Sequence, residues 1–416
     1  MSYCPFFLKI LLYINICNSR TTIIYGYKIE RKTIMILKNK LIKVAMIIQD
    51  YLPRVGGAER QLFALTPLLR DRGVEVAILT RRYPGLAQFE LINDAPVYRL
   101  PFFRSKAIAS LMFTLTSLPV LKKIRPDVIH AHGLLSPTTT AVTAKRFFGT
   151  PVVSKALRGG VLGDLNRLMK KPFGVARFKS LQKQVDAFIT ISNEISDELI
   201  SVGGVHPERC EFIPNGVKLD RFQPVSELRK KQLRKQLQLP DGPIVVFAGR
   251  LEAEKRIDDL VQVWPEIQQR YERITLLVLG TGSLQQKING MAVGKNVILR
   301  GAVDNVSEYL QASDMFVLPS VSEGLSNSLL EALAVGLPVV VTAIGGTMDL
   351  VSHKVSGWII QNYTLQSLRD GIFSFMEDLS LRDACAKEGQ RRVVENYDLY
   401  STADKLNYLY QKLKCS

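Results

Sequence analysis

The stretch that decides the fold runs from Val44 to Arg72 and reads VAMII, then QDYLPRVGG, then AERQLFALTPLLRDR. Its opening apolar run is typical of a short buried strand, and the segment from Ala58 onward has the pattern of an amphipathic helix. Gly56 and Gly57 lie between them. A buried strand that leads through a glycine turn into a helix is the first unit of a parallel α/β sheet.

The same alternation of strand and helix continues along the chain. Buried strands are expected at 44–48, 74–80, 127–130, 151–154 and 187–191 and, after a polar stretch at 226–238, at 244–248, 275–279, 297–299, 315–318 and 338–341. Residues 365–413 are expected to be helical, with a break near Asn396 and Tyr397. We therefore expect an α/β fold class: two Rossmann-like, doubly wound domains face each other across a cleft, and the C-terminal helices pack back toward the first domain.

Length and composition agree with two domains. A chain of 416 residues with 47% hydrophobic residues is too long for one ordinary core. The five cysteines show no C-x-x-C spacing, so neither a zinc cluster nor a disulfide framework is indicated, and a reducing compartment is expected. The expected organisation is an extension at 1–41, a first Rossmann-like domain at 42–220, a second at 221–396 and a C-terminal helix at 397–416.

The N-terminal extension contains an apolar run from Pro5 to Cys17. Lys9 interrupts it, and it is shorter than the roughly 20 residues that span a bilayer. We interpret the extension as not part of the functional protein, with Met35 as the start; a membrane-associating tail and a cleaved signal are the alternatives. No later segment has 18 uninterrupted apolar residues, so a soluble or peripheral protein is expected.

The net charge of +17 is unevenly distributed. Residues 226–416 balance 22 basic against 22 acidic residues, whereas residues 99–183 carry 16 Lys/Arg against Asp127 and Asp164 alone. Such a field attracts nucleic acid, anionic lipid or an acidic substrate.

Two motifs follow strands of the first domain. Gly56-Gly57 lies before a helix, where backbone N–H groups and the helix dipole favour an anion; the alternative is a tight turn. His130 and His132 end a strand, and strand alternation places both side chains on one face. A metal site would need further ligands, so the alternative is a hydrogen-bonded structural histidine.

Two further motifs follow strands of the second domain. Arg250 and Lys255 lie in one strand-to-helix loop and could converge on a diphosphate, Arg as a fork and Lys as a point charge. A solvated charged loop is the alternative. The next strand is followed by Gly280-Thr281-Gly282-Ser283, which could admit a nucleotide.

The strongest signal is EGLSNSLLE, from Glu323 to Glu331, after the strand that ends near Pro319. Glu323 lies in the loop and Glu331 in the first turns of the next helix, so both carboxylates can accept hydrogen bonds from hydroxyls. Glu331 also has a structural explanation, because Ser328-x-x-Glu331 matches a capping box.

Together these residues resemble family 4 of the glycosyltransferases, retaining enzymes of the GT-B fold that use nucleotide-diphosphate sugars. The resemblance covers about residues 43–415. It rests on several motifs in the expected order: GGAE at 56–59, His130-Ala131-His132, IPNGV at 213–217, Arg250 with Lys255, and the two glutamates.

The resemblance implies a role for each of these side chains. Arg250 and Lys255 would neutralise the donor pyrophosphate, and Glu331 would bind the ribose hydroxyls. Glu323 would hold hydroxyls of the donor sugar, and His132 would contact the C6 region of that sugar. His132, Arg250, Lys255 and Glu323 are thus the expected catalytic set.

Backbone near the donor is expected to come from the same loops, with Gly57 approaching the phosphates. The donor-binding residues are expected to be Gly57, Arg250, Lys255, Gly282, Glu323, Gly324, Leu325, Ser326, Asn327 and Glu331. The chain has no Asp-x-Asp motif, so two cations and a helix dipole would replace a metal, and neither a metal nor a cofactor is expected. The resemblance implies a same-face, oxocarbenium-like reaction in which the leaving phosphate helps deprotonate the acceptor.

The resemblance also gives the basic first domain a role, because the first domain of this fold binds the acceptor. Residues 168–173 and 177–179 interleave cations with apolar groups, as an interfacial segment does; a solvated helix face is the alternative. We expect a UDP-sugar rather than a GDP-sugar donor and a glycan or lipid-linked acceptor in polysaccharide or lipopolysaccharide-type biosynthesis. The expected location is cytoplasmic, peripheral on an anionic membrane surface, without nucleic acid. The alternatives are a sugar-nucleotide epimerase of the same fold, a soluble-acceptor glycosyltransferase and a binding protein with a degenerate site.

Overall fold

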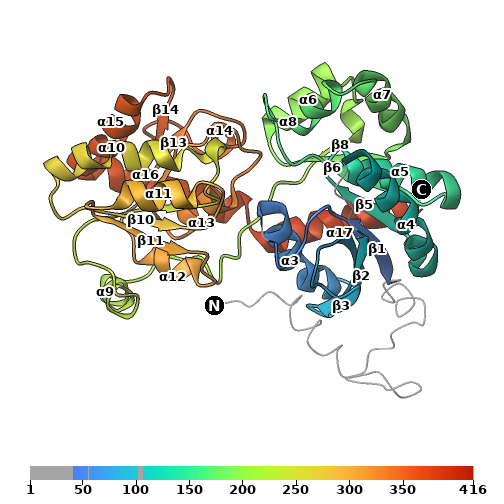
Figure 1. Ribbon diagram of the computed structural model, residues 1–416, viewed down its shortest axis with the longest axis horizontal. Helices are drawn as coiled ribbons and strands as arrows, with labels where there is room; N and C mark the ends of the chain where they lie inside the picture. The colour runs from blue at the N-terminus through green and yellow to red at the C-terminus, as the bar shows by residue number, and fades with distance from the viewer. Residues whose placement is uncertain (1–40, 55, 102–105, 416) are drawn as a thin grey trace, which may run out of the picture. The chain divides into compact units, whose positions relative to one another are not determined.

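The computed structural model describes residues 41–54, 56–101 and 106–415. Nearly all of the expected extension at 1–41, including the run from Pro5 to Cys17 and Met35, lies outside the described residues. Residues 42–415 form one compact unit with two largely parallel sheets, each flanked by helices, which confirms the α/β fold class (Figure 1). We call the part built on the first sheet the first lobe, and the part built on the second sheet the second lobe.

The first sheet has eight strands in the order β3-β4-β2-β1-β5-β6-β7-β8. All neighbours are parallel except β3 and β4. The strands are β1 (Ile42–Ile47), β2 (Val74–Arg82), β3 (Phe89–Ile92), β4 (Ala95–Pro101), β5 (Val128–His132), β6 (Val152–Lys155), β7 (Ala187–Thr190) and β8 (Cys210–Phe212). The five expected strands are present, whereas β3, β4 and β8 were not expected. These three lie toward the sheet edges, where burial on both faces, and with it the continuous apolar run, is not required.

The second sheet has six strands in the order β11-β10-β9-β12-β13-β14. The strands are β9 (Ile244–Ala248), β10 (Thr275–Leu279), β11 (Val297–Gly301), β12 (Met315–Leu318), β13 (Val339–Thr342) and β14 (Trp358–Ile360). Three of the five expected strands have the expected bounds, because fully buried parallel strands are continuous apolar runs that end at glycine or polar residues. The short edge strand β14 was not expected.

Helices cover both sheets (Figure 1). In the first lobe they are α3 (Gly57–Arg70), α4 (Lys106–Ile124), α5 (Ser136–Phe148), α6 (Asp164–Met169), α7 (Gly174–Gln184) and α8 (Asn193–Asp197), which continues as a π-helical turn at Glu198–Val202. In the second lobe they are α9 (Glu227–Gln236), α10 (Ile257–Arg270), α11 (Gln285–Ala292), α12 (Val306–Gln311), α13 (Asn327–Ala334), α14 (Thr347–Leu350), α15 (Leu365–Glu377) and α16 (Leu379–Asn396). Short 3₁₀ turns occupy Pro207–Arg209 and Ala253–Lys255.

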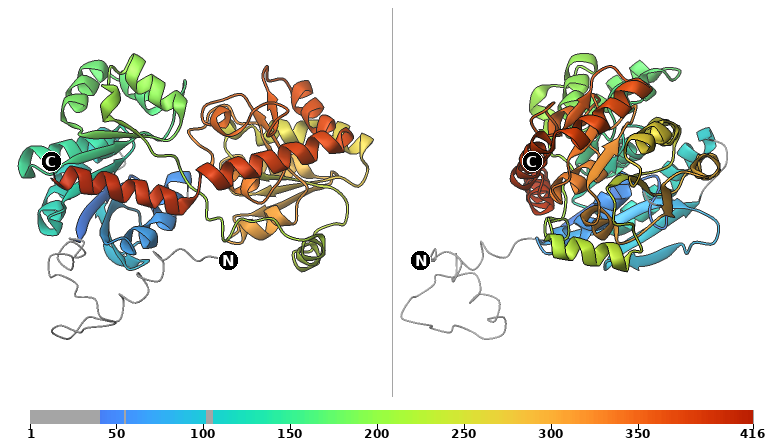
Figure 2. Two further views of the ribbon diagram at one scale, coloured as in Figure 1. Left: turned by 180° about the vertical axis from the view of Figure 1, so that it is seen from behind. Right: turned by 90° about the vertical axis from the view of Figure 1, so that its left-hand side faces the viewer.

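The last helix, α17 (Leu399–Cys415), returns to the first lobe. Its ribbon runs along the first lobe (Figure 2). It packs on α3, β1 and β5, and Leu406 and Tyr410 on its inner face are buried. Helices α15 and α16 instead pack on the second lobe, so the expected return of the C-terminal helices holds for α17. The chain breaks between Asn396 and Leu399, as expected.

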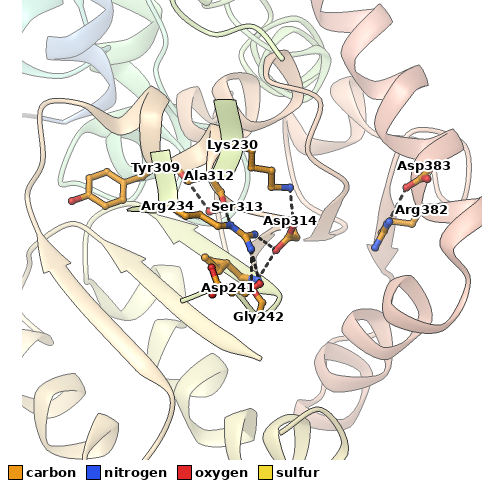
Figure 3. Close-up of polar contacts among 11 residues, drawn as sticks. Lys230, Arg234, Asp241, Gly242, Tyr309, Ala312, Ser313, Asp314, Arg382 and Asp383 are labelled. Carbon is orange, nitrogen blue, oxygen red and sulfur yellow. Dashed lines mark hydrogen bonds and ion pairs between the residues drawn. The ribbon is translucent and has the colours of Figure 1, made fainter. Parts of the chain in front are cut away.

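The amino ends of β9 and β12 carry a polar clamp (Figure 3). Arg234 and Lys230 of α9 bind the Asp314 carboxylate at 2.6 and 2.7 Å, and Asp314 also accepts a hydrogen bond from the Ile244 amide at 2.7 Å. A pocket of about 240 Å³ beside the clamp lies at this amino edge, opposite the strand ends where ligands bind in open α/β sheets. We therefore assign the clamp a structural role and not a role in ligand binding.

None of the helices within the described ranges is long and apolar enough to cross a membrane.

Candidate active site

The loops expected to carry the chemistry of the second lobe meet at one edge of its sheet. Because β10, β9 and β12 are adjacent and parallel, their carboxyl ends lie side by side. The Leu251 amide after β9 donates to the Thr281 carbonyl after β10 at 3.0 Å, and the Val321 amide after β12 donates to the Glu254 carbonyl at 2.7 Å.

Close packing between these loops explains their glycines. A Cβ on Gly282 would lie 2.4 Å from the Leu251 carbonyl oxygen, and one on Gly280 would lie 1.9 Å from that of Gly249. Gly280 also has a φ of +132°, which L side chains rarely adopt. Gly282 is therefore accounted for by loop packing, and its expected donor contact stays a prediction.

Lys255 and Glu323 form an ion pair. Lys255 Nζ contacts Glu323 Oε1, which also accepts a hydrogen bond from Ser320 Oγ at 2.8 Å. The two side chains are only 13% and 10% exposed. In this structure each charge neutralises the other, so an anionic ligand of Lys255 would have to share that cation with Glu323.

Arg250 is held by a different carboxylate. Its guanidinium donates to Glu254 Oε1 at 3.1 Å, and Arg158 of the first lobe lies 3.6 Å from the same oxygen. Glu254 therefore contacts one arginine from each lobe, and it lies in the same loop as Lys255.

Glu331 lies inside α13 and is not a capping residue. Ser326 is the N-cap, since its Oγ accepts the Leu329 amide at 3.4 Å, so the capping box that we considered for Ser328 and Glu331 is wrong. Glu331 Oε2 is buried and has no hydrogen-bond partner in the described part of the chain. Burial raises the pKa of the Glu331 carboxyl to about 7, against the attraction of Arg60 and Arg221. The expected contact of this carboxyl with the ribose hydroxyls stays a prediction.

In the first lobe, His130 and His132 face the same side, as expected. Their rings stack with centroids 4.3 Å apart. His130 Nδ1 is 2.6 Å from the hydroxyl of Tyr410 in α17, which supports the structural explanation for His130. His132 Nε2 is buried without a hydrogen-bond partner among the described residues. Burial and the nearby Lys155 charge lower the pKa of His132 to about 3, so its imidazole is neutral.

Lys155 is a buried residue that belongs to none of the sequence motifs. It is the last residue of β6 and the register partner of His132, and its Nζ donates to Asn215 Oδ1 at 3.0 Å. The expected strand ended at Ser154, one residue too early. A lysine directly after a buried apolar strand was the available signal.

A set of amides joins the two lobes around Asn327, the first residue of α13. Asn327 Oδ1 accepts from Asn215 at 3.1 Å and from Gln61 at 3.2 Å, and its Nδ2 donates to the Gly57 carbonyl at 2.8 Å. Gln61 also donates to the Gly216 carbonyl at 2.6 Å. The expected donor residues Gly57 and Asn327 are therefore in direct contact.

The rest of the EGLSN loop also packs against the first lobe. A Cβ on Gly324 would lie 2.1 Å from the Leu157 carbonyl oxygen, so glycine is required there. The Leu325 carbonyl accepts from Asn215 Nδ2 at 3.3 Å. This loop of the second lobe therefore contacts the first lobe through Gly324, Leu325 and Asn327.

The N-terminus of α3 is occupied by a side chain of its own first turn. The Glu59 carboxylate lies against Gly56, where an added Cβ would come within 2.5 Å of Glu59 Oε2. Burial raises the pKa of the Glu59 carboxyl, and Asp50 adds to the rise, while the neighbouring backbone amides and Arg250 lower it. An anion at this helix end would have to displace Glu59.

Comparisons with known proteins identify the family. The family described as Glycosyltransferase Family 4 matches residues 55–221, and Glycosyl transferases group 1 matches residues 229–392. An uncharacterized glycosyltransferase of Methanocaldococcus jannaschii is 26% identical over 89% of this chain and 98% of its own length. The UDP-Gal:α-D-GlcNAc-diphosphoundecaprenol α-1,3-galactosyltransferase of Escherichia coli is 25% identical over 89% of this chain and 96% of its own length.

A solved structure has the same fold. Anabaena HepE, in complex with UDP-glucose, superposes with a TM-score of 0.73 at 19% identity over 89% of this chain and all of its own. The two matching families together span both lobes and the site between residues 55 and 392. The chain therefore belongs to the family 4 glycosyltransferases of the GT-B fold.

Proposed function

We propose that this glycosyltransferase moves a hexosyl-type sugar from a UDP-sugar to a membrane-associated glycan or glycolipid acceptor, with retention at the anomeric carbon and without a metal. The observation that carries the proposal is the arrangement of Lys255, Glu323, Arg250 and Glu331 at one edge of the second sheet, against an EGLSN loop that contacts the first lobe.

Each side chain has a distinct task in this proposal. Arg250 and Lys255 neutralise the diphosphate as the glycosidic bond breaks, which is useful because negative charge then develops on the leaving group. Glu331 binds the ribose hydroxyls, and Glu323 binds hydroxyls of the sugar. Neutral His132 contacts the C6 region of the sugar from the first lobe.

A same-face reaction agrees with the charges of the site. A double displacement needs a carboxylate beside the anomeric carbon. Glu323 is paired with Lys255 and Ser320, so it is not a free nucleophile in this structure. We propose that the leaving phosphate accepts the acceptor's proton instead.

Two relatives support the substrate classes. The E. coli relative is named for a UDP-galactose donor and a diphosphoundecaprenol-linked acceptor, and the HepE structure was solved with UDP-glucose. We extend both classes, a UDP-sugar and a lipid-linked acceptor, to this chain.

The proposed membrane face lies on α6, α7 and the turn between them. Phe173 is 88% exposed, Val175 is 47% exposed, and Lys170 and Lys179 are exposed beside them. The expected interleaving is wrong in one respect, because Phe178, like Leu168, is buried and packs in the core. Arg177 is also less available than expected, since it donates to Thr139 Oγ1 at 2.6 Å.

The test is release of nucleoside diphosphate from UDP-sugars by the purified chain, with and without lipid extract, in the presence and absence of EDTA. The proposal expects release that increases with lipid extract and persists in EDTA. Interconversion of the sugar nucleotide without transfer would support the epimerase. Loss of all activity in EDTA would restore a metal mechanism.

A further inference from the structure

Lys155 is a buried cation that has no anionic partner among the residues the structure describes. It is 3% exposed, and no carboxylate of the described residues lies within 4.0 Å of its Nζ; its hydrogen bond goes to the neutral amide of Asn215. Burial lowers the pKa of Lys155 to about 8, so the side chain still carries its charge at neutral pH. Burying an unpaired charge is costly, and such groups usually either lose the charge or bind a counterion.

The neighbours of Lys155 are neutral hydrogen-bonding groups. Lys155 and His132 are register partners on adjacent parallel strands, so their side chains leave the same face of the sheet at its carboxyl edge. The Nε2 atoms of His132 and His130 are both buried, and neither has a partner in the described ranges. The cluster therefore offers one cation and unused imidazole nitrogens, and it contains no acid.

We infer that Lys155 and His132 form a subsite for a sugar carboxylate, so that the sugar handled here is a hexuronic acid. The inference rests on the proposed function, in which His132 faces C6 of the transferred sugar, the carbon that carries the carboxylate of a hexuronic acid. One cation with neutral N–H donors matches a monoanion, whereas a phosphate dianion would remain partly unneutralised. The diphosphate also has its own cations, Arg250 and Lys255, on the other lobe.

The position of the cluster agrees with a sugar ligand. Asn215, which holds Lys155, donates through Nδ2 to the Leu325 carbonyl and to Asn327. Lys155 is thus separated by one amide from the loop proposed to bind the donor. A carboxylate that reached Lys155 would lie between the two lobes.

A purely structural role for Lys155 predicts something different. If Lys155 served only to orient Asn215, a neutral donor of similar length would replace it. Lys155→Gln keeps a donor for Asn215 Oδ1 and removes the unpaired charge, which is neutral or favourable for stability. A melting temperature equal to or above that of the parent, together with lost recognition of acidic sugars, separates the two roles.

The experiment measures UDP release by the full chain from UDP-glucuronic acid and from UDP-glucose without added acceptor, and compares the two kcat/KM values. The parent should favour UDP-glucuronic acid, and Lys155→Gln should reduce the preference by about 10- to 100-fold, the usual effect of losing a hydrogen bond to a charged group. Lys155→Arg should retain most of the preference. Lys122→Gln, an exposed cation on α4, serves as the control for net charge and should leave the ratio unchanged.

A second arm asks which sugar carries the carboxylate. It uses UDP-glucose as donor and compares p-nitrophenyl glucuronide with p-nitrophenyl glucoside as acceptors. A Lys155-dependent preference in this arm alone assigns the carboxylate to the acceptor.

Equal ratios for the parent and Lys155→Gln in both arms overturn the carboxylate subsite, while UDP release from UDP-glucose would still uphold the transferase. Absence of UDP release from either donor would instead overturn the proposed function, and the carboxylate subsite would then be judged by UDP-glucuronic acid against UDP-glucose in thermal-shift binding.

Discussion

At the residue scale, the proposed binding of the donor diphosphate depends on Lys255, which is paired with Glu323 in this structure. Lys255→Ala removes a cation that is most useful as charge develops on the leaving diphosphate, so kcat should fall on the order of 100-fold. The melting temperature should also fall, because Glu323, which is only 10% exposed, keeps its hydrogen bond from Ser320 but loses its cation. Steady-state kinetics and thermal melts check this, with Lys287→Ala, an exposed cation paired with Asp258, as the control. Wild-type kcat in Lys255→Ala would remove Lys255 from the site.

The two glutamates should differ in what their loss damages. Glu331 is proposed to bind the ribose equally in the ground and transition states, so Glu331→Gln should mainly raise the donor KM. Glu323 is proposed to touch the transferred sugar, so Glu323→Gln should mainly lower kcat. Donor-saturation curves for both variants give the comparison, and the reverse pattern would mean that the two roles are exchanged.

Glu331 also predicts a pH dependence of stability. Its pKa in the folded chain is about 7 and lies above the ordinary value of 4.5, so the folded state binds the extra proton. Below pH 4.5 the Glu331 carboxyl is protonated in both states and does not lower the free energy of unfolding. As the pH rises toward 7, it lowers that free energy progressively, by about 3 kcal/mol at most. Glu331→Gln cannot ionise, so its melting temperature relative to the parent should rise between pH 5 and 7.5. A difference that is constant with pH would show that Glu331 does not titrate in this range.

At the element scale, α9 is tied to the second sheet by the Asp314 clamp. Asp314→Ala removes the acceptor of Lys230 and Arg234 and leaves the Ile244 amide at the start of β9 unpaired. The expected loss is about 2 to 3 kcal/mol in the free energy of unfolding, measured by urea denaturation. Asp383→Ala is the matched control, because Asp383 is 72% exposed and, within the described residues, its ion pair is with the adjacent Arg382. It should cost less than about 0.5 kcal/mol, and equal losses for the two variants would contradict the assignment.

At the scale of the whole molecule, positive charge is concentrated in the first lobe, and docking on anionic membrane follows from the proposal. Each Lys or Arg near an anionic surface contributes about 1 kcal/mol, and salt weakens the attraction. Vesicles with phosphatidylglycerol should sediment the protein, neutral vesicles should not, and about 0.5 M salt should release it, since the Debye length is then roughly 4 Å.

Charge-reversal variants test which face docks. Lys170→Glu, Lys171→Glu and Lys179→Glu together should abolish sedimentation while donor hydrolysis persists. The control reverses three exposed cations of α9, with Arg229→Glu, Lys231→Glu and Lys235→Glu, and should sediment like the parent. Sedimentation of the first triple variant with anionic vesicles would reject this face as the membrane contact.

The sequence by itself determined the two doubly wound sheets, because a buried parallel strand must be a continuous apolar run and its glycine or polar end can be read locally. It also determined which loops carry cations and carboxylates, since the carboxyl ends of parallel strands share one edge. Partnerships between distant residues were decided by the tertiary structure alone. The hydrogen bonds from Lys155 to Asn215 and from Asn327 to Gly57 form only because the fold brings the end of β6 and the start of α13 close to residues distant in the sequence. Burial, which shifts the pKa of Glu331 upward and that of His132 downward, is likewise a property of the packed chain.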